Sequence, residues 1–210
     1  GLPVSVASHV DAMAGAELLL GRRQAAVPST SLYVYARETV GYALMIDGRV
    51  HTPAGGPGTI AGLPASSELL GGSGRLESTV SDAAVLAAAR RLRILPQGGA
   101  TMTALLRAAR TGPGPAAELL AERARVLGES VALLRDLLNP DDLVVGGQAF
   151  TGYPEGMTLV AEAFAARSVL PPQRIRVTSF GNKVQEAGAG VVSLSGLYAD
   201  PIAAIRRTAA

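Results

Sequence analysis

The stretch LLNPDDLVVGG, residues 137–147, contains a helix end, a buried strand and a tight turn in direct succession. Asn139-Pro140 ends the helix, because proline cannot continue an α-helix. Residues 143–145 form a short apolar run that is typical of a buried strand. Gly146-Gly147 then turns the chain where that strand ends. This order predicts a helix that leads into the interior strand of a sheet.

The longest predicted helix precedes this stretch and covers residues 115–138. It follows the helix breaker Gly112-Pro113-Gly114 and opens on Pro115, a residue favoured at the first helical position. Its apolar side chains recur at helical spacing, which predicts either a core-facing stripe or a dimer seam. These residues are Leu119, Leu120, Val126, Leu127, Val131, Leu134, Leu137 and Leu138.

Strands and helices alternate along the rest of the chain, which predicts an α/β fold with a mixed sheet flanked by helices. Asp47-Gly48 is a hairpin-type turn signal that follows two paired strands. Residues 52–74 are rich in glycine, proline and serine and are expected to be irregular. The expected strands are 3–7, 32–36, 41–46, 143–145 and 174–178, and the expected helices are 8–20, 81–91, 101–110, 115–138, 155–166 and 185–197.

The composition excludes several classes of protein. A chain of 210 residues with 48% hydrophobic residues can bury a core in one or two domains. The absence of cysteine excludes disulfides and thiolate chemistry, and only His9 and His51 could supply metal-ligating nitrogens. No apolar run reaches the length of a membrane span, and no secretory signal pattern is present, so we expect a soluble, cytoplasmic protein.

The charge pattern argues against direct contact with nucleic acid. The formal net charge is only +2, and the arginines are scattered near expected helix ends, where cations suit the helix dipole. Duplex binding normally needs a clustered basic face that makes several phosphate contacts.

Three segments resemble the ROK family, which groups bacterial sugar kinases with transcriptional repressors. Residues 6–17 (VASHVDAMAGAE) resemble a strand-to-helix segment of the family, residues 33–48 resemble its phosphate hairpin, and residues 137–147 resemble its LLNPEVIVLGG stretch. The resemblance implies an actin-like, ribonuclease-H-like lobe. It also places Gly1 well inside a typical family chain, so residues 1–210 are expected to form the C-terminal large lobe. The first lobe and the DNA-binding head are then expected to lie outside this chain.

The same resemblance identifies candidate ligand-binding residues. His9 matches the catalytic aspartate of the kinases, Ser8 matches a sugar-holding asparagine, and Asp11 matches the asparagine that follows. Glu77 matches a glutamate that touches sugar hydroxyls. Two alternatives stay open: Ser8 and Asp11 have the spacing of a helix capping box, and Glu77 would suit a helix start or a solvated surface. With the aspartate replaced, no catalytic residue is expected.

The phosphate and zinc signatures of the family are depleted here. Its GTGIG stretch aligns with residues 37–41, which keep only Gly41 and place Glu38 where phosphates would lie. Because like charges repel and the glycines that let backbone amides approach phosphate are missing, we expect no use of ATP. The histidine and three cysteines that bind zinc in the family align with Leu63, Glu68, Leu70 and Arg75, and a nearby family glutamate aligns with Ile60, so no metal is expected. Glu68 and Arg75 could form a replacing ion pair.

These observations favour the effector-sensing and oligomerisation domain of a ROK-type transcriptional regulator, catalytically inactive and without cofactor. The expected partners are a second copy in a homodimer, a sugar-like effector, and DNA contacted only through an N-terminal helix-turn-helix. The alternatives are a ROK sugar kinase that uses ATP and a scaffold with no role on DNA.

Overall fold

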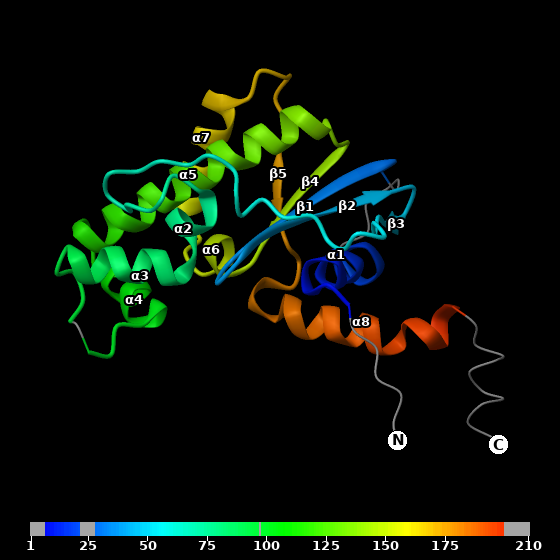
Figure 1. Cartoon of the computed structure of the whole chain (residues 1–210), viewed down its shortest axis with the longest axis horizontal. Coiled ribbons are helices and arrows are strands. Elements are labelled where there is room, and N and C mark those ends of the chain that lie inside the picture. The colour runs from blue at the N-terminus through cyan, green and yellow to red at the C-terminus, as the bar shows by residue number, and fades with distance from the viewer. Residues whose placement is uncertain (1–6, 22–27, 97, 200–210) are drawn as a thin grey trace.

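The computed structural model describes residues 7–21, 28–96 and 98–199, and within them the strands form one mixed sheet (Figure 1). The strand order is β3-β2-β1-β4-β5. The first three strands pair antiparallel, whereas β4 and β5 run parallel to β1. The predicted mixed sheet is therefore confirmed. The strands are β1 (Thr30–Ala36), β2 (Val40–Ile46), β3 (Arg49–Val50), β4 (Asp142–Gly146) and β5 (Ile175–Val177).

Helices cover both faces of this sheet, so the molecule has three layers (Figure 1). One face carries α1 (His9–Leu20) and α8 (Val184–Ala199), which pack against each other. The opposite face carries the remaining helices. These are α2 (Leu76–Val80), α3 (Asp82–Arg91), α4 (Met102–Arg110), α5 (Pro115–Leu138), α6 (Gln148–Thr151) and α7 (Gly156–Arg167).

The central strands contribute side chains to both cores, because successive residues of a strand point to opposite faces. Leu32 and Val34 of β1 lie in the core under α2 to α7. Tyr33 and Tyr35 lie in the smaller core under α1 and α8. All four side chains are buried. The sequence of β1 therefore reads as nearly continuous apolar and aromatic residues, as a strand covered on both faces requires.

The long helix α5 follows its prediction closely. It begins at Pro115 and ends at Leu138, where Asn139 adopts a left-handed conformation with φ of 42°. Most of the apolar stripe is buried within this chain, so it serves mainly as core rather than as a dimer seam. Leu137 and Leu138 at the end of the helix differ, because 69% and 38% of their surfaces are exposed.

The predicted elements that lie in the described part of the chain are found with boundaries shifted by at most two residues. Asp47 and Gly48 form the predicted hairpin turn, with φ of 49° and 72°, and residues 52–74 are irregular as expected. Two short helices, α2 and α6, the two-residue strand β3 and the 3-10 turn η1 (Gly181–Lys183) were not predicted. The strand expected over residues 3–7 lies outside the described residues except for Ala7, which is not in a strand.

No helix in the described part of the chain is both long enough and apolar enough to cross a bilayer.

Candidate functional site

The first turn of α1 holds three of the four candidate ligand-binding residues. Ser8 is the N-cap, and its Oγ accepts a hydrogen bond from the Asp11 backbone N–H at 3.3 Å. The capping interpretation of this pair is therefore confirmed for Ser8. Burial raises the pKa of Asp11, and the nearby His9 and His51 oppose that shift. Asp11 thus lies near both histidines of the chain.

His9 packs against the sheet through an aromatic contact. Its ring meets the Tyr35 ring edge-on, with centroids 5.3 Å apart and an interplanar angle of 84°. His9 itself is exposed, whereas Tyr35 is buried. His9, which the resemblance aligns with the catalytic aspartate of the kinases, therefore sits on the surface against the end of β1.

Glu77 lies on the opposite side of the β1–β2 hairpin, in the first turn of α2. Its Oε2 accepts a hydrogen bond from the Val40 backbone N–H at 3.1 Å. Among the described residues, no hydrogen bond or ion pair joins Glu77 to Ser8, His9 or Asp11. The structure thus places the four candidates on both sides of one hairpin and gives Glu77 an anchoring contact with β2.

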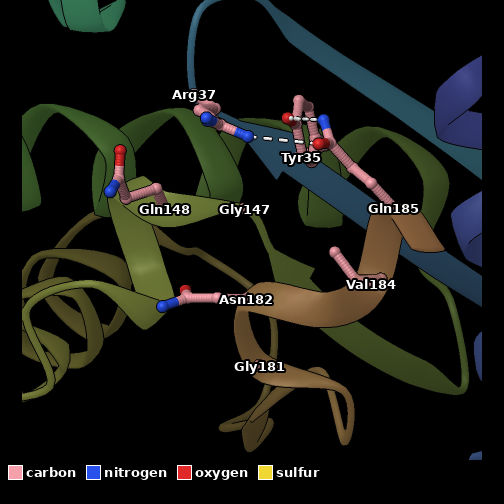
Figure 2. A pocket seen from close by; sticks show the side chains of 8 residues that line it. All are labelled: Tyr35, Arg37, Gly147, Gln148, Gly181, Asn182, Val184 and Gln185. Atoms are coloured by element: carbon pink, nitrogen blue, oxygen red, sulfur yellow. Dashed lines mark hydrogen bonds between the residues drawn. The ribbon is translucent and has the colours of Figure 1, made fainter. Parts of the chain in front are cut away.

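A pocket of about 160 Å³ opens at the carboxyl ends of the parallel strands β1 and β4 (Figure 2). Ligands of open α/β sheets bind in such crevices. The lining combines a cation, a phenol and three amide side chains with two glycines and a valine. These residues are Tyr35, Arg37, Gly147, Gln148, Gly181, Asn182, Val184 and Gln185.

A chain of two hydrogen bonds closes one side of this pocket, as the dashed lines in Figure 2 show. Arg37 Nη1 donates to Gln185 Oε1 at 3.1 Å. Gln185 Nε2 donates to the Tyr35 hydroxyl at 2.9 Å. The tip of the hairpin is thereby tied to the start of α8, and we call this contact the Arg37 latch.

The latched pocket is smaller than most sites for small molecules. Its volume lies below the roughly 300 to 1,000 Å³ of ordinary small-molecule sites. Glu38, whose side chain is 62% exposed, forms an ion pair with Arg37 across 3.2 Å at the hairpin tip. The Glu38 carboxylate repels phosphate, and its ion pair partly neutralises the positive charge of the Arg37 guanidinium.

Apolar packing and a backbone contact position the loop that resembles the family's zinc signature. Ile60 and Leu70 are buried in the apolar core, and Glu68 makes no ion pair with Arg75, so the expected replacing pair is wrong. Within the described residues no cluster of three or more histidine, cysteine or acidic side chains could hold a metal ion. The Arg91 guanidinium instead donates to the Leu69 carbonyl at 2.6 Å and fixes the loop against α3.

A buried carboxylate near the end of α1 was missed by the sequence analysis. Glu17 accepts hydrogen bonds from Thr178 Oγ1 at 2.8 Å and from the Ser179 backbone N–H at 3.1 Å. Arg176 lies 3.7 Å from the same carboxylate. This arrangement ties α1 to the segment between β5 and α8. The available signal was a single acidic residue inside an apolar alanine and leucine run.

The pocket residues Gln148, Asn182 and Gln185 were also missed. They follow the ends of β4 and β5 by two to eight positions, but nothing in their local sequence marks them. The one usable signal was the rule that carboxyl ends of neighbouring parallel strands meet at one edge of the sheet. Applying it required the strand order, which only the structure supplies.

The family comparison matches residues 1–193 to the model described as "ROK family". The chain belongs to the ROK family. Proteins named as transcriptional regulators from Mycobacterium tuberculosis and Mycobacterium bovis are each 73% identical to it over 220 aligned residues. Those alignments cover all of this chain and half of each relative. This ROK chain therefore spans about half the length of the curated relatives it matches.

Solved ROK structures share the fold, an actin-like ATPase lobe. The ROK hexokinase from Thermus thermophilus is 25% identical, with a TM-score of 0.70 over 87% of this chain and 64% of that one. A ROK family transcriptional regulator, a homologue of the Escherichia coli Mlc protein, is 22% identical, with a TM-score of 0.73 over 91% and 52%. A ROK glucokinase from Streptomyces griseus, solved with glucose and AMPPNP, has a TM-score of 0.71 at 21% identity, over 91% and 68%. Kinases and regulators of the family thus share this lobe.

Proposed function

We propose that this chain is the effector-sensing and oligomerisation lobe of a ROK-type transcriptional regulator, and that it transfers no phosphate. The observation that carries the proposal is the Arg37 latch, which closes the pocket at the carboxyl ends of β1 and β4. The identity of 73% to proteins named as transcriptional regulators supports the same assignment.

Catalysis would also need a base aimed at a sugar hydroxyl and a cradle for the transferred phosphate. His9 stands at the matching position of the base but packs edge-on against Tyr35. The hairpin tip offers the carboxylate of Glu38 instead of glycine amides. Both features favour sensing over phosphate transfer.

The effector site in this proposal is the surface on both sides of the hairpin, with Ser8, His9, Asp11 and Glu77 as contacts for a sugar-like ligand. Titration calorimetry with glucose, N-acetylglucosamine and mannose tests the site. We expect one of these sugars to bind. His9→Ala and Glu77→Gln should each weaken the affinity for that sugar about tenfold, because each removes one hydrogen bond or contact. Glu186→Gln, an exposed change on α8, is the matched control. Equal sugar affinity for all variants would show that the sugar does not bind at these residues.

The contact with DNA is assigned to an N-terminal helix-turn-helix outside residues 1–210. A gel shift at physiological salt compares the full-length Mycobacterium tuberculosis regulator with this chain, using DNA upstream of the regulator's own gene. We expect the full-length protein to bind with sequence specificity and this chain to fail, since its +2 charge is not clustered. Sub-micromolar, specific binding by this chain would contradict the assignment.

Self-association is assigned to the exposed apolar end of α5. Leu137 is 69% exposed and Val169 is 83% exposed. The Val169 backbone N–H donates to Asp136 at 2.9 Å, so both side chains lie at the same end of the molecule. We expect a homodimer by light scattering at tens of micromolar and a monomer for Leu137→Glu. A monomeric unmodified chain would refute the dimer.

A further inference from the structure

A groove is lined mainly by residues of α5 and α7. Figure 1 shows these two helices on the face of the sheet opposite α1 and α8. The volume of the groove is about 650 Å³, about four times that of the pocket in Figure 2. Leu69 and Leu159 are the large apolar side chains that line the groove. Ala121, Ala163 and Ala166 line it with small side chains. The groove shares no lining residue with the effector site or the latched pocket.

The two helices that form the groove run parallel and touch closely at Gly128. A side chain there would place its Cβ 2.5 Å from the Val160 carbonyl oxygen and 2.9 Å from the Ala163 Cβ. Ala124 approaches Gly156 before this point, and Arg135 donates to Ser168 Oγ after it. Close packing of α5 against α7 therefore fixes the walls of the groove relative to each other.

The dimensions suit a third helix. On α5 the groove-lining residues Glu118, Glu122, Arg125 and Glu129 recur every three or four positions, and at 1.5 Å per residue they span about 16 Å. That length equals about three helical turns. Helices pack into the valley between two neighbouring helices through ridges of this spacing.

The rim of the groove is acidic although the whole chain carries a net charge of +2. Four glutamates and two arginines line it, which gives a net charge of −2. Arg125 is already paired with Glu122 and Glu129. Hydrogen bonding from Arg125 lowers the pKa of Glu122, so this carboxylate stays charged at neutral pH. Glu118 and Glu162 make no ion pair with any described residue, and they are exposed.

We propose that this groove binds an amphipathic helix of a partner protein, with an apolar stripe against Leu69 and Leu159 and with lysines or arginines facing Glu118 and Glu162. Apolar contact along the floor supplies affinity, and the unpaired carboxylates select a basic partner.

The probe is a fluorescein-labelled, acetylated and amidated peptide of leucine, alanine and lysine, about 15 residues long. Leucine occupies positions i, i+3, i+4 and i+7 so that it forms one stripe. Fluorescence anisotropy at physiological salt should show binding at least about tenfold tighter than for a peptide of the same composition with scattered leucines. A third peptide with glutamate in place of lysine should bind weakest.

Two pairs of variants locate the binding site. Glu162→Lys reverses a rim charge and should weaken the striped peptide about tenfold, whereas Glu186→Lys on α8 makes the same charge change elsewhere and should not. Ala166→Trp fills the groove and should abolish binding, whereas Ala165→Trp, exposed on the same helix outside the groove, should not.

Three results would overturn the proposal. Equal affinity for the striped and scattered peptides would show that the peptides bind only through general attraction between charged surfaces. Equal behaviour of Glu162→Lys and Glu186→Lys would move the site elsewhere. Conversion of a dimer to a monomer by Ala166→Trp alone would show that a second copy, rather than a basic helix, covers the groove.

Discussion

Two turns meet at the same edge of the sheet and differ in what their backbones require. The Gly146-Gly147 turn ends β4, and a Cβ at Gly147 would lie 2.4 Å from the Ala36 carbonyl oxygen. Gly147 also adopts φ of +92°, which side chains rarely allow. The hairpin tip opposite carries Arg37, Glu38 and Thr39, and none of these has a positive φ. One turn needs glycine for its own packing, and the other does not.

This difference explains which family glycines remain in the chain. The glycines that the fold requires are present at residues 146 and 147, whereas those that the resemblance assigns to phosphate contact are absent from the hairpin tip. The loop that resembles the family's zinc signature repeats the pattern. Gly71 and Gly74 have positive φ values of +73° and +80°, whereas the positions that the resemblance assigns to metal ligands hold other residues. Glycine is thus present where the backbone requires it, and the residues that the resemblance assigns to ligand contact are replaced.

Gly147→Ala should give the largest loss of stability. The added Cβ meets the Ala36 carbonyl, and the backbone is held at positive φ, so both overpacking and strain contribute. We expect a loss of about 3 kcal/mol or more in the free energy of unfolding, measured by urea denaturation followed by circular dichroism. A loss below about 1 kcal/mol would show that the turn tolerates a side chain.

Gly146→Ala should destabilise by about 1 to 3 kcal/mol through a different contact, because its Cβ would lie 2.0 Å from the Tyr33 hydroxyl oxygen. That hydroxyl is buried and makes no hydrogen bond of normal geometry. Burial raises the pKa of Tyr33, and the nearby Thr178 hydroxyl and Glu17 carboxylate are smaller influences. The tyrosine therefore stays neutral at any ordinary pH.

Tyr33→Phe removes the clashing oxygen and tests this explanation. In a double-mutant cycle, Gly146→Ala should cost less in the Tyr33→Phe background than in the wild type. Tyr33→Phe alone should change stability by less than about 1 kcal/mol, since it removes an unsatisfied polar atom. Additive losses would place the cost of Gly146→Ala somewhere other than this oxygen.

Changes at the hairpin tip should have a smaller effect. Arg37→Gly with Thr39→Gly restores two of the family's glycines and removes the latch hydrogen bond to Gln185. We expect a loss of about 1 to 2 kcal/mol, from one partly exposed hydrogen bond and added chain entropy. A loss as large as that of Gly147→Ala, in the same denaturation assay, would erase the proposed difference between the two turns.

The sequence predicted most of the fold because its signals were local. Asn139-Pro140 and Gly112-Pro113-Gly114 mark the two ends of α5, and Asp47-Gly48 marks a hairpin. The unpredicted helices α2 and α6 are only five and four residues long. Helices this short carry too few residues for a periodic pattern and depend on tertiary contacts.

The candidate site was less predictable because its contacts join distant parts of the chain. The position of Ser8 as a helix cap followed from its spacing to Asp11. The latch joins residues 37 and 185, and the Glu17 cluster joins residues 17 and 178, across more than 140 positions in each case. No local pattern indicates such partners. The edge-on contact of His9 with Tyr35 likewise required knowledge of which helix covers which end of β1.

Titration calorimetry of this chain with ATP and magnesium tests the central claim most directly, namely that the hairpin and its latch no longer serve a nucleotide. The Streptomyces griseus glucokinase, solved with AMPPNP, is the positive control. The account predicts no measurable heat of binding at millimolar ATP. A dissociation constant of about 100 μM or tighter, roughly 5.5 kcal/mol of binding free energy, would contradict it.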